Sequence, residues 1–377
     1  MKTIEIGKYK KQKEGYKAFI PNPFPPKEGF DFSNKIIKKN DKAIRLLGKL
    51  DGITQLLPNI DFFIFMYIRK DAASSSQIEG TRASLVNAVE AEANIEKDIP
   101  EDVSDILNYI KALNYGLKRV KEFPFSLRFL RELHKELMEE GRKTQFSDPG
   151  SFRKTQNWIG GKNIKEASHV PPPPAEMKKA LDDLEKFLYE KDDNLPLIKA
   201  GLAHAQFETI HPFLDGNGRT GRMLITFYLW KEGLLEKPVL FLSSYFKRNQ
   251  QAYYDRLSGY HDEEVEKWLE FFLDGVIEIA DEAITTVHKI TEIRDRDIMK
   301  IQSLSKRASK SAMNVLPKLY KLPIVDVARV QDWIGFSRSG AKKVVDRFVD
   351  MGILKLRDPK KEYGRSYVYE DYMNIFM

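Results

Sequence analysis

The sequence predicts a mainly α-helical fold that carries one short β-hairpin and ends in a small module of helices and strands. Apolar residues recur at helical spacing along most of the chain. A Gly-Gly pair at 160–161 lies between two extended segments, and helix and strand signals alternate after about residue 305. With 377 residues, 42 % of them hydrophobic, the chain can bury a substantial core and form two or three domains of about 150 residues each.

The composition excludes several classes of protein. The sequence contains no cysteine, which rules out disulfide scaffolds, thiolate metal sites and cysteine catalysis. The longest apolar run, 62–68, is far shorter than the roughly 20 residues that a membrane-spanning helix needs. The first residues are polar and lack the apolar stretch of a secretory signal. We therefore expect a cytoplasmic protein that makes no membrane contact.

The N-terminal region begins with a polar segment and a proline-rich stretch at 20–26. Because prolines at this density exclude helix and sheet interiors, we expect an extended surface arm up to about residue 35. Helical periodicity then begins near Asn34, and Gly141 marks a helix stop. The apolar positions that carry the periodicity are Leu46, Leu47, Leu50, Ile53, Ile106, Ile110, Leu113, Leu117, Leu127, Phe129, Leu130, Leu133 and Leu137.

The helical pattern is interrupted in the middle of the chain. Residues 152–170 read as two extended segments joined by a tight turn at Gly160-Gly161, which predicts a short β-hairpin. Four prolines at 171–174 then lead into the next helix. Helical periodicity resumes and continues, with breaks, over 175–301.

The tail of the chain predicts a helix-turn-helix followed by a basic hairpin, which is the pattern of a winged helix-turn-helix domain. We place this domain at 306–377, behind a helical linker at 276–305. The expected elements are a helix over 322–333, a turn over 335–337, a helix over 337–351, a strand over 352–356, a loop over 357–364 and a strand over 365–370.

All of the net charge of +7 lies in this tail. Residues 305–377 contain 15 Lys and Arg against 8 Asp and Glu, whereas the rest of the chain holds 47 of each sign. Such asymmetry suggests an acidic partner, with DNA bound through 306–377 as the first candidate. On charge alone, a solvated basic surface is the simpler explanation.

The residues most suggestive of chemistry lie at 204–222. An apolar helix there is stopped by Pro212, which leaves His211 at its C-terminal end. The run Asp215-Gly216-Asn217-Gly218 predicts a tight loop, and a new helix begins near Arg219. A glycine-rich loop that opens a helix offers free backbone N–H groups and the positive end of the helix dipole to phosphates.

The charged side chains around this loop fit a nucleotide. Arg219 and Arg222 are three residues apart, so both project from one side of the first helical turn and suit a polyphosphate. Asp215 offers an oxygen ligand to the Mg²⁺ that accompanies a nucleoside triphosphate, and His211 can take a proton near neutral pH. Together they form the parts of a nucleotidyl- or phosphoryl-transfer site, although each residue alone has an ordinary structural explanation.

The run His-Pro-Phe-x-Asp-Gly-Asn-Gly-Arg-x-x-Arg at 211–222 resembles the signature of the Fic family of protein AMP-transferases at every defined position. Residues 158–161 and 171–174 are similar to the family's flap hairpin and the segment after it. Ser244-Tyr245-Phe246 and Tyr253-Tyr254-x-x-Leu257 resemble the segment that closes the nucleotide pocket, and Ser75-x-x-x-Glu79-Gly80 resembles the family's inhibitory motif.

This resemblance covers roughly residues 20–275 and implies a domain organisation. The core, 101–275, is expected to be a Fic-type helical domain with a short β-hairpin flap. The preceding 1–100 would hold the N-terminal arm and an inhibitory helix. The tail resembles the winged helix of some bacterial members.

The resemblance also implies an activity, in which AMP is moved from ATP to a Ser, Thr or Tyr hydroxyl of a target protein and pyrophosphate is released. His211 would be the general base, and Asp215 would hold Mg²⁺ between the α- and β-phosphates. Arg219 and Arg222 would neutralise the β- and γ-phosphates. The remaining nucleotide-binding residues would be Gly216, Asn217 with its side-chain donor, Gly218, Tyr245, Tyr253 and Tyr254.

Docking and regulation follow from the same resemblance. The target would add a strand to the flap, Trp158–Val170, through main-chain hydrogen bonds. Glu79, with Ser75 and Gly80, would pair with Arg222 and inhibit the enzyme by occupying the place of the γ-phosphate. An ordinary surface salt bridge is the alternative explanation for Glu79.

Other functions stay open from the sequence. In some relatives, the glutamate that corresponds to Glu79 positions water for removal of AMP from the target. Rare members of the family transfer another phosphate-linked group. The chain could instead be a DNA-binding regulator whose core senses nucleotide. A second copy of the chain, forming a homodimer, is a further partner that the sequence leaves open.

Overall fold

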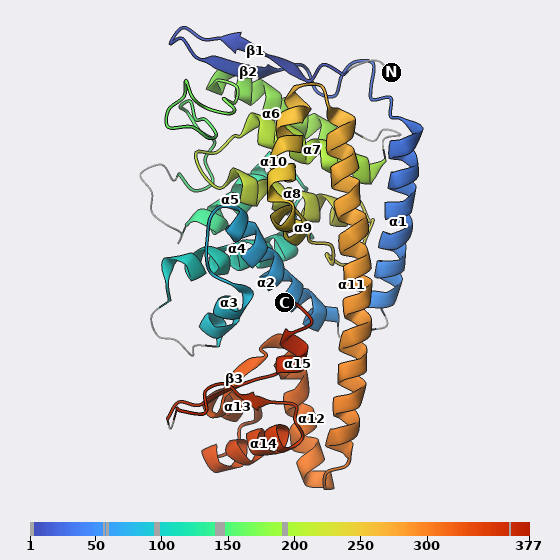
Figure 1. The fold of residues 1–377 in the computed structure, drawn as a ribbon, viewed down its shortest axis with the longest axis vertical. Helices are drawn as coiled ribbons and strands as arrows, with labels where there is room; N and C mark the ends of the chain where they lie inside the picture. The colour runs from blue at the N-terminus through green and yellow to red at the C-terminus, as the bar shows by residue number, and fades with distance from the viewer. Residues whose placement is uncertain are drawn as a thin grey trace.

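The computed structural model describes residues 4–55, 57, 60–93, 99–139, 148–190, 195–361 and 363–377. Helices make up most of this part of the chain (Figure 1), so the predicted mainly α fold is confirmed. The helices are α1 (Asn34–Thr54), α2 (Ile60–Ile78), α3 (Leu85–Glu92), α4 (Glu101–Arg119), α5 (Leu127–Met138), α6 (Pro174–Tyr189), α7 (Pro196–Ile210), α8 (Asn217–Lys231), α9 (Ser243–Arg248), α10 (Gln250–His261), α11 (Val265–Gln302), α12 (Lys306–Lys321), α13 (Val327–Ile334), α14 (Arg338–Asp350) and α15 (Glu370–Met373). The strands are β1 (Gly7–Lys11), β2 (Lys17–Pro21), β3 (Ile324–Asp326), β4 (Lys355–Leu356) and β5 (Ser366–Val368).

Helices α7 and α8 pack against each other at the centre of the core. Nearly every residue of both is buried, because apolar and small residues cover all of their faces. Helices α2, α4 and α5 contact α8 from one side, and α11 contacts α7 from the other. This packing fixes the loop between α7 and α8, which carries the predicted site residues.

The N-terminal arm differs from the prediction of an extended surface segment. Residues 7–21 form an antiparallel hairpin in which Gly7 of β1 lies opposite Pro21 of β2. The strands end where the proline-rich stretch begins, so the prolines do not interrupt the ladder. The N–H of Phe19 donates to the carbonyl of Val170 at 2.8 Å, which joins the hairpin to the end of the flap.

The predicted flap hairpin is present in reduced form. Its two segments pair through a single antiparallel bridge between Ile159 and His169. Gly160 and Gly161 both adopt positive φ, 67° and 71°, as a tight turn requires. Bends and turns fill the rest of the loop. The helix stop predicted at Gly141 lies outside the described residues.

Helix α11 runs for 38 residues along the length of the molecule, with α1 packed along it (Figure 1). Near its start, Trp268 donates from Nε1 to the carbonyl of Gly201 on α7 at 2.8 Å. Near its end, Ile301 is fully buried. The expected start of a linker at residue 276 therefore falls inside one unbroken helix. None of the described helices is both long and apolar enough to span a membrane.

The C-terminal elements follow the predicted order with one correction. The residues expected to begin a helix at 322 form strand β3 instead, and helix α13 starts at Val327. Two features explain the change: Ile324 and Val325 are buried β-branched residues, and Asp326 caps α13 by accepting from the N–H of Arg329 at 2.7 Å. The strands form a sheet in the order β3-β5-β4.

Of the C-terminal elements, α12 and the residues that follow α15 pack against the first half of α2. The ring of Phe376 meets that of Tyr67 edge-on at 5.5 Å, and Lys321 Nζ lies 5.0 Å from the ring of Phe65. Arg357 forms an ion pair with Glu90 of α3. One end of α2 thus contacts the C-terminal elements, while its other end reaches the core.

Candidate functional site

The loop between α7 and α8 has the geometry that the sequence predicts. Helix α7 ends because His211 adopts the left-handed conformation, φ 47°, and Pro212 follows. Gly216 has φ 76° and precedes the first turn of α8, which starts at Asn217 rather than near Arg219. The backbone N–H groups of this turn have no intrahelical acceptor, so the start of α8 is suited to an anion.

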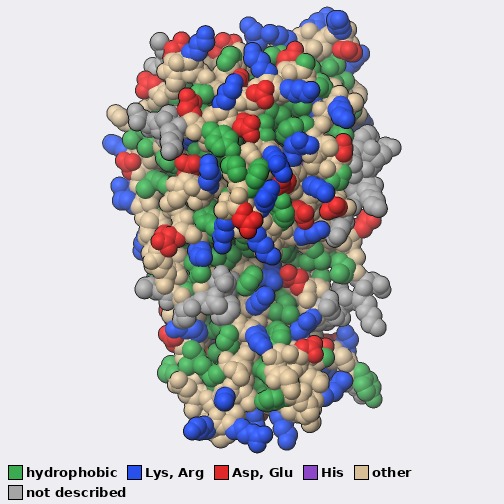
Figure 2. All heavy atoms as spheres, turned by 180° about the vertical axis from the view of Figure 1, so that it is seen from behind, with side chains coloured by type: hydrophobic (Ala, Val, Ile, Leu, Met, Phe, Trp, Pro, Cys, Tyr) green, Lys and Arg blue, Asp and Glu red, His purple; other side chains and the backbone are tan. Residues whose placement is uncertain are grey.

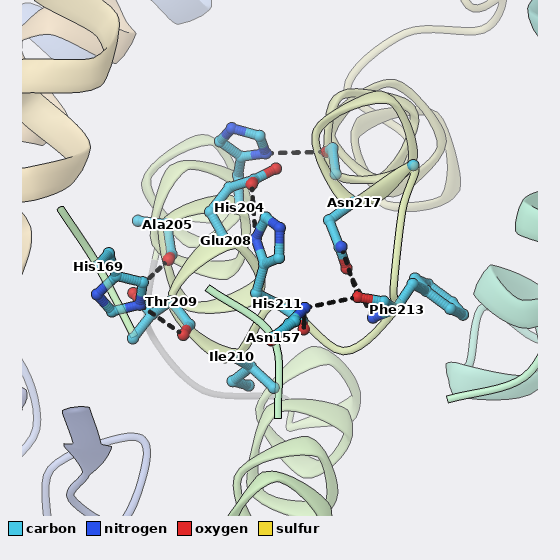
Figure 3. A network of polar contacts seen from close by, with 12 residues as sticks. Asn157, His169, His204, Ala205, Glu208, Thr209, Ile210, His211, Phe213 and Asn217 are labelled. Atoms are coloured by element: carbon cyan, nitrogen blue, oxygen red, sulfur yellow. Dashed lines mark hydrogen bonds and ion pairs between the residues drawn. The ribbon is translucent and has the colours of Figure 1, made fainter. Parts of the chain in front are cut away.

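The side chain of Asn217 closes the loop. Its Nδ2 donates to the carbonyl of Phe213 at 2.8 Å, and its Oδ1 accepts from the N–H of the same residue at 2.8 Å (Figure 3). The side chain is buried. Its donation of a hydrogen bond to a phosphate stays a prediction.

Two residues that sequence reasoning missed also hold the loop. Arg153 donates from Nε to the carbonyl of His211 at 3.0 Å, and Asn157 donates from Nδ2 to the carbonyl of Phe213 at 2.9 Å. The ring of His134 stacks on Phe213 at 3.7 Å. All three lie far from the loop in the chain, so no local pattern in the sequence indicates them.

The ring of His211 lies within the site, with 18 % of its side chain exposed. Burial, with smaller contributions from His169 and Arg153, lowers the pKa of His211 to about 3. The ring is therefore neutral at pH 7 and can accept a proton. Its Nδ1 lies 3.8 Å from Oε2 of Glu208, one turn earlier on α7.

Glu208 is a further site residue that the sequence analysis missed. Burial raises its pKa to about 8, which Arg222 opposes and Glu79 reinforces. An acidic residue on the inner face of an otherwise apolar helix, three residues before the histidine, is the signal that could have identified it.

The two arginines and Asp215 meet at the start of α8. Both arginine side chains are almost fully buried, whereas 46 % of the Asp215 side chain is exposed. Oδ1 of Asp215 accepts from the N–H of Gly216 at 2.6 Å and lies 3.6 Å from Nη2 of Arg219. Among the described residues, Nε of Arg219 is buried without a hydrogen-bond partner, which indicates an unfilled acceptor position.

The predicted contact between Glu79 and Arg222 is present. Arg222 donates from Nη2 to Oε1 of Glu79 at 2.8 Å and from Nε to the hydroxyl of Ser75 at 2.8 Å. Gly80, two residues after the end of α2, has φ 96°. A Cβ atom on Gly218 would lie only 2.4 Å from Oε1 of Glu79, so the carboxylate rests on the first turn of α8.

The charges of this pair stabilise each other. Burial would raise the pKa of Glu79, but the guanidinium of Arg222 outweighs it and keeps this pKa below its usual value. Burial would likewise lower the pKa of Arg222, and Glu79 raises it instead. The carboxylate is therefore ionised at neutral pH and occupies the anion position at the start of α8.

The three tyrosines predicted to bind nucleotide differ in burial. Tyr245 and Tyr253 are buried, and the hydroxyl of Tyr253 lies 2.9 Å from Nε2 of His204. Tyr254 is exposed and donates to the carbonyl of Ile78 at 3.2 Å. The rings of Tyr253 and Tyr254 lie 5.5 Å apart, and the contact of the three tyrosines with nucleotide stays a prediction.

Asp215 is the residue that could hold a metal ion. The described residues contain no group of three or more acidic or histidine side chains with the geometry of a metal site. A single exposed carboxylate beside an anion site fits Mg²⁺, which commonly uses one or two protein carboxylates together with substrate phosphates.

Two sequence models match the chain. The model of the Fic/DOC family N-terminal region matches residues 37–118, and that of the Fic/DOC family matches residues 124–229. The second match contains α7, α8 and the loop between them.

Curated relatives carry the name "Protein adenylyltransferase Fic". The one from Drosophila grimshawi is 28 % identical over 206 residues, which cover 52 % of this chain and 39 % of the relative. The one from Aedes aegypti is 28 % identical over 208 residues, covering 52 % and 38 %. The chain thus spans about two fifths of the length of these relatives.

Solved structures share the fold. A Fic family protein from Desulfovibrio desulfuricans superposes with a TM-score of 0.58 and 18 % identity, over 90 % of this chain and 97 % of that one. A Fic domain containing signaling protein from Bacteroides thetaiotaomicron superposes with a TM-score of 0.53 and 19 % identity, over 65 % and 97 %. The signature loop, the two sequence matches and the shared fold together identify this chain as a member of the Fic/DOC family.

Proposed function

We propose that this chain transfers AMP from ATP to a hydroxyl group of a target protein and of itself, releasing pyrophosphate. The observation that carries the proposal is the anion site at the start of α8, where two buried arginines and an exposed carboxylate lie beside a neutral histidine. The curated relatives that share the signature are named as protein adenylyltransferases.

The phosphates of ATP would occupy the start of α8. Its backbone N–H groups at Asn217 and Gly218 would bind the phosphate oxygens, and Arg219 and Arg222 would neutralise the β- and γ-phosphates. The Glu79 carboxylate on this turn supports the assignment, because an anionic group already lies at this position.

Asp215 would hold Mg²⁺ at the phosphates. Its exposed carboxylate at the mouth of the loop has room for such a ligand. When bound, the ion would offset the charge that develops on the leaving pyrophosphate. Arg219, 3.6 Å away, would orient the carboxylate.

The reaction needs a base for the target hydroxyl and a leaving group that departs with negative charge. His211 would take the proton of the target hydroxyl, whose oxygen then forms a bond to the α-phosphorus. The bond between that phosphorus and the bridging oxygen breaks, and the pair of electrons leaves with pyrophosphate. The low pKa of His211 keeps its ring unprotonated, which is the state that this step requires.

The flap would dock the target. The bridge between Ile159 and His169 leaves most main-chain groups of this loop unpaired within the flap, and Trp158 is 44 % exposed beside it. A strand of the target could therefore add to the flap through its main chain. This mode of recognition fixes the position of the target hydroxyl but reads few side chains.

Glu79 would inhibit the reaction in this state. Arg222 is engaged by Glu79 and Ser75, so it cannot at the same time bind a γ-phosphate in the productive position. Release of the C-terminal end of α2 would free the arginine. The balance between the two states would then set the basal rate.

Transfer from two labelled forms of ATP tests the proposal. The Glu79→Gly variant is incubated with ATP labelled either at the α-phosphate or at the γ-phosphate, with Glu79→Gly/His211→Ala as the control. We expect label in protein only from the α-position and only when His211 is present. Label from the γ-position would instead indicate phosphorylation, and no label from either would contradict the proposal.

A second candidate function is nucleic-acid binding by the C-terminal elements. Arg338, Lys342 and Lys343 are exposed on α14, and Lys360 and Lys361 are exposed beside β4. Seen from behind, Lys and Arg side chains line the lower end of the molecule (Figure 2). If these groups contact phosphates, binding of the full chain to duplex DNA should weaken steeply with salt and be lost in Lys342→Glu/Lys343→Glu. Equal retention of the variant would contradict it.

A further inference from the structure

Glu208 is a largely buried acid that takes part in none of the proposed steps of AMP transfer. Its side chain is 11 % exposed and points from α7 toward the ring of His211 (Figure 3). Its Oε1 atom is buried and, among the described residues, has no hydrogen-bond partner. A buried carboxyl oxygen without a partner is costly, so a structural role alone does not explain it.

The backbone of α8 approaches this carboxyl closely at Gly221. A Cβ atom on Gly221 would lie 2.4 Å from Oε1 of Glu208. Any larger residue at 221 would displace the carboxyl from its place between α7 and α8. The pair Glu208 and Gly221 thus forms a fitted contact directly behind the histidine.

Nδ1 of His211 is the atom that this carboxyl faces. It lies 3.8 Å from Oε2 of Glu208 and forms no hydrogen bond within the described part of the chain, although the backbone of Glu208 lies near the ring and raises the pKa of His211. A shift of less than one ångström, of the kind that accompanies substrate binding, would bring the two atoms into hydrogen-bond contact. The second ring nitrogen, Nε2, would then be the one available to substrate.

We propose, resting on the proposed function, that Glu208 is the positioning residue for His211: its carboxylate accepts a hydrogen bond from Nδ1–H and thereby leaves Nε2 free to take the proton of the incoming hydroxyl. The ring then carries one proton on each nitrogen until the product leaves, and Glu208 itself gains none. A histidine base oriented by a carboxylate behind it is a recurring arrangement in enzymes.

The ionisation of Glu208 gives the proposal a measurable signature. A neutral Glu208 carboxyl can donate to Nδ1 and so direct the ring proton to Nε2, the unproductive position, whereas the carboxylate does the reverse. The charged groups that face Glu208 are Arg222, which lowers its pKa, and Glu79, which raises it. Those that face His211 are His169, Arg153 and Glu79.

Glu79 therefore affects the base as well as the arginine. With Glu79 in place, the pKa of Glu208 is about 8, so its carboxyl is largely neutral at pH 7. Removing Glu79 lowers this pKa and favours the carboxylate. The AMP-transfer rate should accordingly rise with pH as Glu208 ionises, and this rise should begin at lower pH in Glu79→Gly than in the wild type.

Nitrogen-15 NMR of the full chain with labelled histidine tests the proposal without relying on activity. The chain has 6 histidines, and the signal of His211 is identified by its loss in His211→Asn. We expect the ring proton to move to Nδ1 as pH is raised from 6 to 9 in the wild type, because Glu208, whose pKa is about 8, ionises in this range. Glu208→Leu should abolish this movement, and Glu90→Gln, which changes a buried glutamate of α3, should not. An unchanged His211 signal in Glu208→Leu would overturn the proposal.

Kinetics in the Glu79→Gly background complete the test. Glu208→Leu should lower the AMP-transfer rate at saturating ATP by about 10²-fold with ATP affinity unchanged. Glu208→Gln can still accept a hydrogen bond from Nδ1–H but carries no charge. It should therefore retain a larger share of the parental rate than Glu208→Leu, and its rate should no longer rise with pH. Rates and pH profiles equal to those of the parent would contradict the role of Glu208. Absence of transfer in the parent itself would contradict the proposed function alone.

Discussion

Arg222 and Glu79, 143 residues apart in the chain, form an ion pair whose Nη2 and Oε1 atoms lie 2.8 Å apart. The side chain of Arg222 is only 2 % exposed, while that of Glu79 is 38 % exposed. The arginine is therefore a fixed part of the α8 surface, and the glutamate is the partner that solvent can reach. This asymmetry favours exchange of the carboxylate for another anion.

Ser75 should contribute to the inhibited state. Its hydroxyl accepts from Nε of Arg222 at 2.8 Å, and a hydrogen bond to a charged group contributes about 1.5 kcal/mol or more. Ser75→Ala should therefore raise basal AMP transfer by roughly tenfold, less than removal of Glu79. Ser74→Ala, one position earlier on the same helix, is the matched control and should leave the rate unchanged. Equal rates for the two serine variants would remove Ser75 from the inhibitory contact.

His211→Ala should abolish AMP transfer while leaving ATP binding nearly intact. The ring serves the incoming hydroxyl, whereas the nucleotide is bound by the start of α8. Loss of a general base costs roughly 10²–10⁴-fold in rate. The check is a calorimetric titration with ATP beside a transfer assay, both in the Glu79→Gly background. A folded variant that transfers at the parental rate would show that another group is the base.

Much of the site can be predicted from the sequence because the residues that form it lie in a short run. Loop geometry, the arginine pair and the place of His211 follow from residues 211–222, where glycine, proline and helical spacing act over short distances. The Glu79 contact follows from a second short motif. Residues that act on the loop from afar could not be found in this way, since Arg153 supports it across 58 positions.

The errors have physical causes as well. Prolines at 20–26 predict an extended segment, but the hairpin β1–β2 depends on the pairing of the residues before them. The strand before α13 is only three residues long, and its pairing with β5 depends on residues about 40 positions later.

Stability should depend on pH through Glu208. Its pKa rises from about 4.5 to about 8 on folding, so the folded state keeps a proton that the unfolded state has lost. The resulting stabilisation is complete below about pH 4.5 and is lost as pH rises through 8. The free energy of unfolding, measured with urea, should therefore fall more between pH 5 and pH 9 in the wild type than in Glu208→Gln. Parallel losses in the two proteins would mean that Glu208 ionises normally.

The contact between the C-terminal elements and α2 should contribute strongly to stability. Phe376 is 3 % exposed and packs on Tyr67 and Tyr372. Phe376→Ala should lower the free energy of unfolding by about 3 kcal/mol, as for other buried aromatic side chains. Met377→Ala, with the neighbouring side chain 72 % exposed, should change it by less than about 0.5 kcal/mol. Similar unfolding midpoints for both variants would show that this contact is not formed.

The AMP-transfer rate of wild type against Glu79→Gly, at saturating ATP, tests the central claim most directly. Arg222 can bind either the Glu79 carboxylate or the γ-phosphate, so removing the carboxylate should raise self-modification and target modification strongly. A hundredfold rise corresponds to about 2.8 kcal/mol, which a partly buried Arg–carboxylate contact can supply. Arg222→Ala should not reproduce the rise, since it also removes the phosphate partner. Equal rates for wild type and Glu79→Gly would contradict the account and leave Glu79 as an ordinary salt-bridge residue.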